Sequence, residues 1–189
     1  MPSEGIGYLI NLRHIHFYGE EQMPANIGRL TSLQTLQDSF YVGTRKGLKI
    51  EELGSLSKLK GSLKIRYLER VNDKLEAKQA KLHEKAVDEL ELWWELGRSE
   101  VELEGNHDEE VLEGLRPHPN LQRLVIDCYG EEVEESLDFS FIHHIHASLE
   151  KLSLDGWEKL TQLPHQIQHL IALRELEIRN FSKLDALPE

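Results

Sequence analysis

Cysteine is almost absent from this sequence of 189 residues, with Cys128 as its single example. One thiol cannot form a disulfide bond within the chain, and this fits a reducing compartment. No apolar run approaches the ~18 residues that a membrane-spanning helix needs. The opening stretch, MPSEGIGYLINLRH, also lacks the apolar core of a signal peptide. We therefore expect a cytoplasmic chain without a membrane span.

Positive charge is scarce as well. The chain has 22 Lys and Arg against 34 Asp and Glu, which gives a formal net charge of −12. Phosphate groups repel such a chain, so nucleic acid and anionic membranes are disfavoured as partners. The phosphate-binding motif G-x-x-x-x-G-K-[ST] is missing, so we expect no bound nucleotide. No nucleophile, base and stabilising group can be assembled from the pattern, so we expect no enzyme and no cofactor.

Leucine, by contrast, recurs at regular intervals. Residues 149–154 and 173–178 both read L-x-x-L-x-[LI], with a shift of 24 residues between them. The same motif recurs along the chain in whole or in part, and its central residues are Ile15, Leu36, Leu63, Leu90, Leu124, Leu152 and Leu176. A repeat of this form and length is typical of leucine-rich-repeat proteins.

The motif predicts an α/β solenoid. Side chains alternate in a short strand, so motif positions 1, 4 and 6 point into a shared core and positions 3, 5 and 7 point outward. One repeat cannot bury enough apolar surface to fold alone, and stacked repeats form a curved horseshoe with a parallel inner sheet. We expect about seven short strands with irregular or helical outer segments, in one leucine-rich-repeat domain over 1–189.

The segment 69–118 is rich in Glu, Lys and Ala, and it predicts enlarged, helix-rich repeats within that domain. Asn72 is expected to cap a helix that runs as far as Ala86, with a capping-box pattern at Asp73 and Glu76. These helices would lie on the outer face of the solenoid.

Two further irregular stretches follow. Asn106 is expected to cap a short helix, EEVLEGL, which ends before Pro117. Residues 129–146 are expected to form an irregular insertion.

Aromatic residues occupy motif position 9 in four repeats, where many leucine-rich repeats carry Asn or Cys. These residues are Tyr41, Tyr129, Trp157 and Phe181. We expect them to pack as an aromatic spine under the turns.

Several stretches carry a more specific resemblance: IGYLINLRHI, MPANIGRLTSLQTL, GLKIEELGSLSKLKGSLKI, EEVLEGLRPHPNLQRLVIDCYG and EKLTQLPHQIQHLIALRELEI. Together they resemble the leucine-rich-repeat region of plant coiled-coil nucleotide-binding leucine-rich-repeat (NB-LRR) disease resistance proteins. The resemblance covers nearly the whole chain.

The resemblance implies a protein-recognition and autoregulatory module in plant innate immunity. Such a module helps to hold the receptor's nucleotide-binding domain at rest, and it contributes to sensing a pathogen effector or a guarded host protein. The alternative is a free-standing leucine-rich-repeat scaffold or inhibitor that binds another protein. The chain opens and closes inside a repeat, so we expect a truncated solenoid whose ends expose apolar surface and self-associate.

The outward motif positions are the candidate partner-binding residues of the inner face. They are His14, His16, Tyr18, Thr35, Gln37, Ser39, Lys64, Arg66, Glu89, Glu91, Trp93, Arg123, Asp127, Lys151, Asp155, Glu175, Glu177 and Arg179, with Ser62, Val125 and Ser153 at further positions of the same kind.

Two local clusters admit more than one interpretation. A strand through Trp93 and Trp94 would bury one ring and expose the other, and an exposed Trp on the inner face would suit a binding hot spot. We favour the alternative, in which both rings pack against the predicted 72–86 helix. His143, His144 and His146 lack a second group of ligands, so we expect a solvated loop and no metal site.

Overall fold

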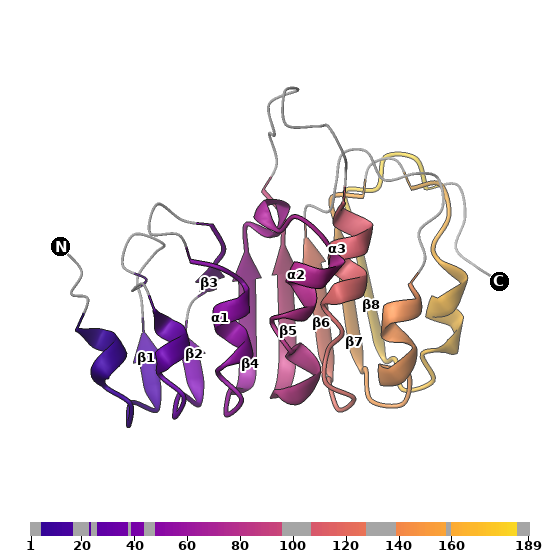
Figure 1. Cartoon of the computed structure of the whole chain (residues 1–189). Helices are drawn as coiled ribbons and strands as arrows, with labels where there is room; N and C mark the ends of the chain where they lie inside the picture. Colours follow the sequence, from indigo (N-terminus) through magenta and orange to yellow (C-terminus); the bar gives the residue numbers. More distant parts are fainter. Residues whose placement is uncertain are drawn as a thin grey trace, which may run out of the picture.

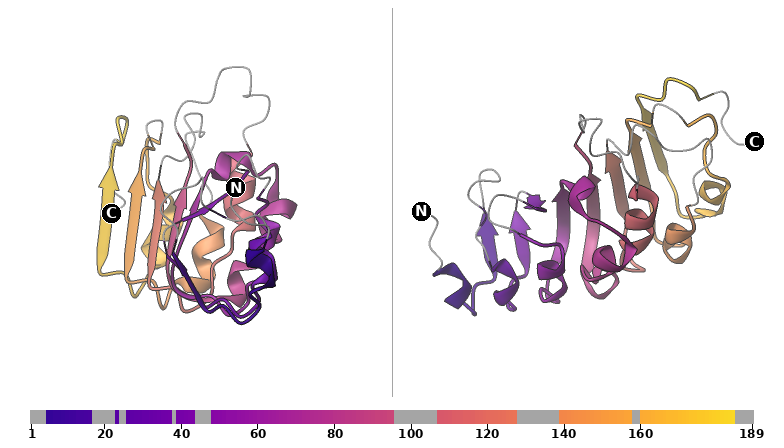
Figure 2. Two further views of the ribbon diagram at one scale, coloured as in Figure 1. Left: turned by 90° about the vertical axis from the view of Figure 1, so that its left-hand side faces the viewer. Right: turned by 45° about the horizontal axis from the view of Figure 1, so that its top comes forward.

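A computed structural model describes residues 5–16, 23, 26–37, 39–43, 48–95, 107–127, 139–157 and 160–184. The described part of the chain is a curved stack, with strands along one side and short helices along the other (Figure 1). Views from other directions separate these two layers (Figure 2). The predicted leucine-rich-repeat fold is confirmed, with a parallel sheet at its centre.

Among the described residues, eight short strands form the inner layer, and all the pairs between them are parallel. They are β1 (His14–His16), β2 (Thr35–Gln37), β3 (Ser39–Tyr41), β4 (Lys60–Arg66), β5 (Ala86–Trp93), β6 (Arg123–Asp127), β7 (Lys151–Asp155) and β8 (Glu175–Arg179). The outer layer contains the 3-10 helices η1 (Ile6–Tyr8), η3 (Ile27–Arg29), η4 (Leu68–Arg70), η5 (Leu82–Glu84), η7 (Ser140–Ile145) and η8 (His165–His169), and the α-helices α1 (Glu51–Gly54), α2 (Lys74–Lys78) and α3 (Asp108–Gly114).

The predicted central residues of the motif are aligned by the register of the sheet. Ile15 pairs with Leu36 at one end, and Leu152 pairs with Leu176 at the other. Between them, Leu63, Leu90, Leu124 and Leu152 lie side by side in successive strands. The central residues of the sequence motif therefore all lie in strands, and they align between the strands that pair.

The second repeat departs from this regularity. Leu36 pairs with Ile15 in β2, but the next core residue that pairs onward is Phe40, which lies beside Ile65 in β3. Ile65 comes two positions after Leu63, whereas Phe40 comes four positions after Leu36, so the chain carries two extra residues here. The insertion splits one repeat into two strands and divides the ladder into a two-stranded and a six-stranded sheet.

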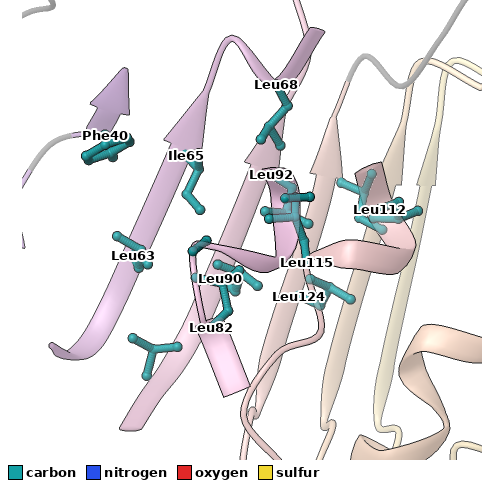
Figure 3. Close-up of a cluster of buried hydrophobic side chains, with 14 of the residues drawn as sticks. Phe40, Leu63, Ile65, Leu68, Leu82, Leu90, Leu92, Leu112, Leu115 and Leu124 are labelled. Carbon is teal, nitrogen blue, oxygen red and sulfur yellow. The ribbon is translucent and has the colours of Figure 1, made fainter. Parts of the chain in front are cut away.

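Apolar side chains from both layers form one continuous core. Leu63, Ile65, Leu90, Leu92 and Leu124 are almost completely buried, and Figure 3 shows them in a cluster of apolar side chains along the strands. Full burial of such a side chain contributes about 1.5–3 kcal/mol, so stacking the repeats supplies what a single repeat lacks.

The helix predicted from Asn72 to Ala86 is wrong in its extent, and its cap is not Asn72 but Asp73, in agreement with the capping-box pattern predicted at Asp73 and Glu76. α2 ends at Lys78, and Asp73 is its cap, with the side chain accepting a hydrogen bond from the Glu76 N–H at 2.8 Å. The chain then forms η5, and Ala86 is the first residue of β5. Strand β5 is eight residues long and begins at Ala86, a residue that the helical pattern assigned to the outer face.

The short helix predicted over EEVLEGL is confirmed as α3, but its N-cap is His107 instead of Asn106, which is outside the described residues. Gly114 of α3 lies against α2, where a Cβ on Gly114 would come within 2.5 Å of the Ala77 Cβ. The two helices therefore pack at a separation that only glycine permits. Within the expected insertion at 129–146, η7 is described, whereas residues 129–138 lie outside the described part.

Candidate protein-recognition surface

The predicted inner-face positions of β4 to β8 are arranged in three straight rows across the sheet. In each row, one residue per strand lies beside its neighbour in register. The lower row is Ser62, Glu89, Arg123, Lys151 and Glu175; the middle row is Lys64, Glu91, Val125, Ser153 and Glu177; the upper row is Arg66, Trp93, Asp127, Asp155 and Arg179. Towards the N-terminus, His14 lies beside Thr35 and His16 beside Gln37.

Three of the predicted inner-face residues, Ser39, Val125 and Ser153, are buried. Ser39 is aligned with Lys64 but is only 1% exposed, so its assignment to the open face is wrong. It follows the two-residue insertion, which a regular motif does not anticipate. Val125 and Ser153, in the middle row on β6 and β7, are also buried, so these two side chains offer little surface to a partner. Tyr18 lies outside the described residues.

Oppositely charged side chains pair across neighbouring strands of this face. The Lys64 Nζ is 3.2 Å from the Glu91 Oε2, and the Lys151 Nζ is 2.6 Å from the Glu175 Oε1. The Arg123 guanidinium is 3.8 Å from a carboxylate oxygen of Glu89. Partly exposed pairs of this kind contribute about 0–1 kcal/mol each, so they order the surface more than they stabilise the fold.

Glu177 is the centre of the ionic cluster on β7 and β8. Burial opposes its ionisation, but the hydrogen bond and charge of Arg179, the charge of Lys151 and the Ser153 hydroxyl together lower the pKa of this carboxyl. Glu177 therefore stays ionised and holds both cations near it at neutral pH.

Trp93 is a large aromatic side chain on this face, and it is partly exposed. The Lys64 Nζ lies 3.9 Å from the ring centroid, and the Arg66 guanidinium carbon lies 4.9 Å from it. The indole Nε1–H donates to the Glu91 Oε2 at 3.2 Å. Three charged neighbours thus fix the orientation of one large aromatic side chain on an open sheet.

Trp94 points the other way, as strand alternation requires. It is 3% exposed, and its Nε1–H donates to the Asp108 Oδ1 of α3 at 3.1 Å. The favoured prediction, that both rings pack against the 72–86 segment, is therefore wrong for Trp93. The hot-spot alternative describes its position better.

Comparison with known proteins gives the family. Residues 50–181 match the family model described as R13L1/DRL21 leucine-rich repeats. The chain belongs to this leucine-rich-repeat family. The matched range contains β4 to β8, so all three rows of the inner face lie inside it.

The curated relatives include several plant proteins. The chain is 43% identical over 110 residues to "Putative disease resistance protein RGA1" of Solanum bulbocastanum, which covers 57% of this chain and 10% of that protein. It is 36% identical over 157 residues to "Putative disease resistance RPP13-like protein 1" of Arabidopsis thaliana, covering 79% of this chain and 14% of that protein. "Disease resistance protein RGA2" of Solanum bulbocastanum is 40% identical over 121 residues, covering 62% and 12% respectively.

The chain therefore spans between 10% and 14% of the length of these relatives. No solved structure matches it. The resemblance to the leucine-rich-repeat region of plant NB-LRR disease resistance proteins is confirmed by the family and by the names of the relatives.

His143, His144 and His146 lie in or directly after η7, in the outer layer and away from the inner face. The His144 Nε2 is 2.7 Å from the Pro117 carbonyl oxygen, and burial lowers the pKa of His144, against the opposing effect of that hydrogen bond. The His146 Nδ1 is 2.7 Å from the His143 carbonyl oxygen. Among the described residues, no three His, Cys, Asp or Glu side chains are grouped so as to hold a metal ion.

The expected aromatic spine is present only in separate pieces. Trp157 and Phe181 are stacked with their ring centroids 6.2 Å apart. Tyr41 instead pairs with Tyr67, at 5.8 Å, and Tyr67 was not foreseen because it lies outside the motif. Tyr129 and Cys128 lie outside the described residues. In the described part of the chain, no helix is long and apolar enough to span a membrane.

Proposed function

We propose that this chain is a non-enzymatic, cytoplasmic protein-recognition and autoregulatory module of a disease resistance receptor in plant innate immunity. The names of its relatives and its family support the defence role. The observation that carries the recognition role is Trp93, a partly exposed aromatic side chain among charged neighbours on an open inner sheet.

The inner face has the features of a protein-binding surface. Tryptophan and arginine are the residue types that most often dominate binding energy, and here Arg66 lies over Trp93. Ion pairs between neighbouring strands place polar groups around Trp93 and Arg66. When a partner covers the face, these groups exclude water from the contact with Trp93. Ion pairs and the Trp93 hydrogen bond already hold several side chains of this face in place, so binding has fewer side chains to order and loses less entropy.

Autoregulation follows if the receptor's own nucleotide-binding domain and an incoming protein use the same face. The nucleotide-binding domain would cover Trp93 in the resting state, and an effector or a guarded host protein would compete with it. Such competition links recognition to release of the domain without a conformational change in the solenoid.

The test is binding of the chain to a separately expressed nucleotide-binding domain from a plant NB-LRR receptor, measured by biolayer interferometry. Trp93→Ala should weaken binding by about 30-fold or more, because a hot spot contributes at least ~2 kcal/mol. Leu75→Ala is the control, since Leu75 is 68% exposed on the outer helix α2. Loss of binding in Leu75→Ala, with Trp93→Ala unchanged, would assign recognition to the outer layer and contradict the proposal.

A further inference from the structure

Arg66 differs from the other cations in the three rows of the inner face. The rows contain five cationic side chains, and four of them form an ion pair with a glutamate of the same face: Lys64 with Glu91, Arg123 with Glu89, Lys151 with Glu175, and Arg179 with Glu177. The Arg66 guanidinium instead lies over the Trp93 ring, with its carbon 4.9 Å from the ring centroid. Within the described part of the chain, Arg66 is therefore the cation of these rows that has no carboxylate.

The carboxylate next to Trp93 is already occupied. The Glu91 Oε2 is 3.2 Å from the Lys64 Nζ, and it also accepts the hydrogen bond of the Trp93 indole at 3.2 Å. One carboxylate thus balances the charge of Lys64 and leaves that of Arg66. The group formed by Lys64, Arg66, Glu91 and Trp93, here called the Trp93 cluster, keeps one positive charge.

Covering Trp93 has a consequence for this charge. The guanidinium lies over the ring, so a partner cannot bury the Trp93 ring without also removing water from Arg66. A charge that is taken out of water costs much free energy unless an opposite charge pairs with it. The other four cations bring their own carboxylates into the contact, whereas Arg66 needs one from the partner.

The acidic residues of the upper row limit where that group can lie. Trp93 is flanked by Arg66 on β4 and by Asp127 on β6, and Asp155 follows on β7. Neighbouring strands are about 4.8 Å apart, so Asp127 is roughly 10 Å from Arg66 along the row. An anionic group of the partner is therefore attracted over β4 and repelled over β6 and β7.

We propose that the protein partner places an Asp or Glu side chain on Arg66, and that this carboxylate pairs with both arms of the guanidinium when the partner covers Trp93. The inference rests on the proposed function, because it names the chemistry of the partner at the same face. A planar carboxylate matches the arginine fork with two parallel hydrogen bonds. The partner's groups over Asp127 and Asp155 are neutral or basic, which sets the direction in which it lies across the strands.

A single carboxylate fits this position better than a polyanion. The Trp93 cluster has one positive charge to neutralise, and the chain as a whole has a net charge of −12. A nucleic acid strand would bring several phosphates against Asp127, Asp155 and this net charge. A protein surface can present one acidic residue among neutral ones.

Binding to the separately expressed nucleotide-binding domain of a plant NB-LRR receptor tests the pair, with biolayer interferometry as the measurement. Arg66→Met keeps a long side chain over Trp93 and removes the charge. It should weaken binding by about 30-fold or more, because the partner's carboxylate is left without its cation. Arg66→Lys keeps the charge but loses the fork, so it should lose less affinity than Arg66→Met.

Arg29→Met is the matched control. Arg29 also lies over an aromatic ring, with its guanidinium carbon 5.1 Å from the Tyr8 ring centroid, but it belongs to η3 in the outer layer. This variant changes the net charge by the same amount as Arg66→Met, and it should bind as the wild-type chain does.

A charge reversal identifies the acidic residue on the partner. Arg66→Glu should abolish binding, because it sets two carboxylates against each other. Replacement of one Asp or Glu of the nucleotide-binding domain by Arg should restore binding to Arg66→Glu and weaken binding to the wild-type chain. Restored binding also shows that the Arg66→Glu chain is folded.

The outcomes separate this inference from the proposed function. If Trp93→Ala weakens binding and Arg66→Met does not, the inner face binds the partner without a carboxylate on Arg66, and the inference is overturned alone. If Trp93→Ala binds as the wild-type chain does, the proposed function itself is contradicted. If no Asp or Glu replacement restores binding to Arg66→Glu, the ion pair does not exist. If phosphatase treatment of the domain removes the effect of Arg66→Met, the anion is a phosphoryl group, which also overturns the inference.

Discussion

Lys85 is a lysine at the boundary of η5 and β5, and its burial leads to a quantitative prediction. It is 0% exposed, and its Nζ has a long contact of 3.4 Å to the Lys81 carbonyl oxygen. Burial is the main cause that lowers the pKa of Lys85 from 10.5 to about 8; the charge of Glu84 opposes this effect and that of Lys81 adds to it. A charged amine in this place costs free energy, because water is not available to solvate it.

The pKa shift gives the size of the effect. The difference between 10.5 and about 8 corresponds to at most about 3 kcal/mol, at 1.36 kcal/mol per pKa unit. Between these two pH values the unfolded chain binds a proton that the folded chain has released, so the free energy of unfolding rises with pH across this window. Below pH 8 both states are charged, and the folded state carries the full cost.

Lys85→Met should therefore stabilise the protein at pH 7, by roughly 1–3 kcal/mol, because Met fills a similar volume without charge. The advantage should shrink between pH 8 and pH 10.5, where the wild-type lysine loses its proton. Urea unfolding at a series of pH values measures the difference between the two proteins, which removes the contribution of other titrating groups.

Lys78→Met is the matched control, since Lys78 is exposed at the end of α2. Its effect should stay within about 0.5 kcal/mol at every pH. A Lys85→Met variant that is less stable than wild type at pH 7, with a pH-independent difference, would refute the reasoning. It would mean that the amine is solvated or paired in the folded state.

Three further predictions concern the repeats themselves, each checked by urea unfolding at low protein concentration. Leu124→Ala should cost about 2–5 kcal/mol because Leu124 is completely buried, whereas Leu176→Ala should cost less than about 1 kcal/mol because Leu176 is 38% exposed; equal costs would contradict this difference in burial. Asp73→Ala should cost about 1 kcal/mol by removing the cap of α2, and Asp73→Asn should restore most of it. Gly54→Ala should cost more than ~2 kcal/mol because its Cβ would lie 2.3 Å from the Gln79 carbonyl oxygen, and a neutral result would mean that the two turns separate easily.

The periodicity of the sequence predicted most of the inner layer, because strand geometry relates sequence spacing directly to side-chain direction. Leu124 and Leu152 are three residues after the first leucine of their motifs, and the register places them side by side. The same alternation puts Trp93 and Trp94 on opposite faces, and the prediction of helix packing for both rings is wrong because strand β5 continues as far as Trp93.

The outer layer could be predicted less well, because several competing features decide its form. The pattern through Leu75 and Leu82 suits a helix locally, but the long strand β5 requires the chain to turn back before Ala86. The burial of Ser39 depends on an insertion whose effect appears only when β3 pairs with β4. The hydrogen bond between Trp94 and Asp108 joins residues 14 positions apart that no motif connects.

We propose that the inner sheet face around Trp93 binds a protein partner. Hydroxyl-radical footprinting of the chain with and without the nucleotide-binding domain of a plant NB-LRR receptor tests this directly, because radicals oxidise accessible tryptophan side chains. Oxidation of Trp93 should fall in the complex, while exposed Leu75 on α2 should be oxidised equally in both samples. Protection of Leu75, with undiminished oxidation of Trp93, would contradict it.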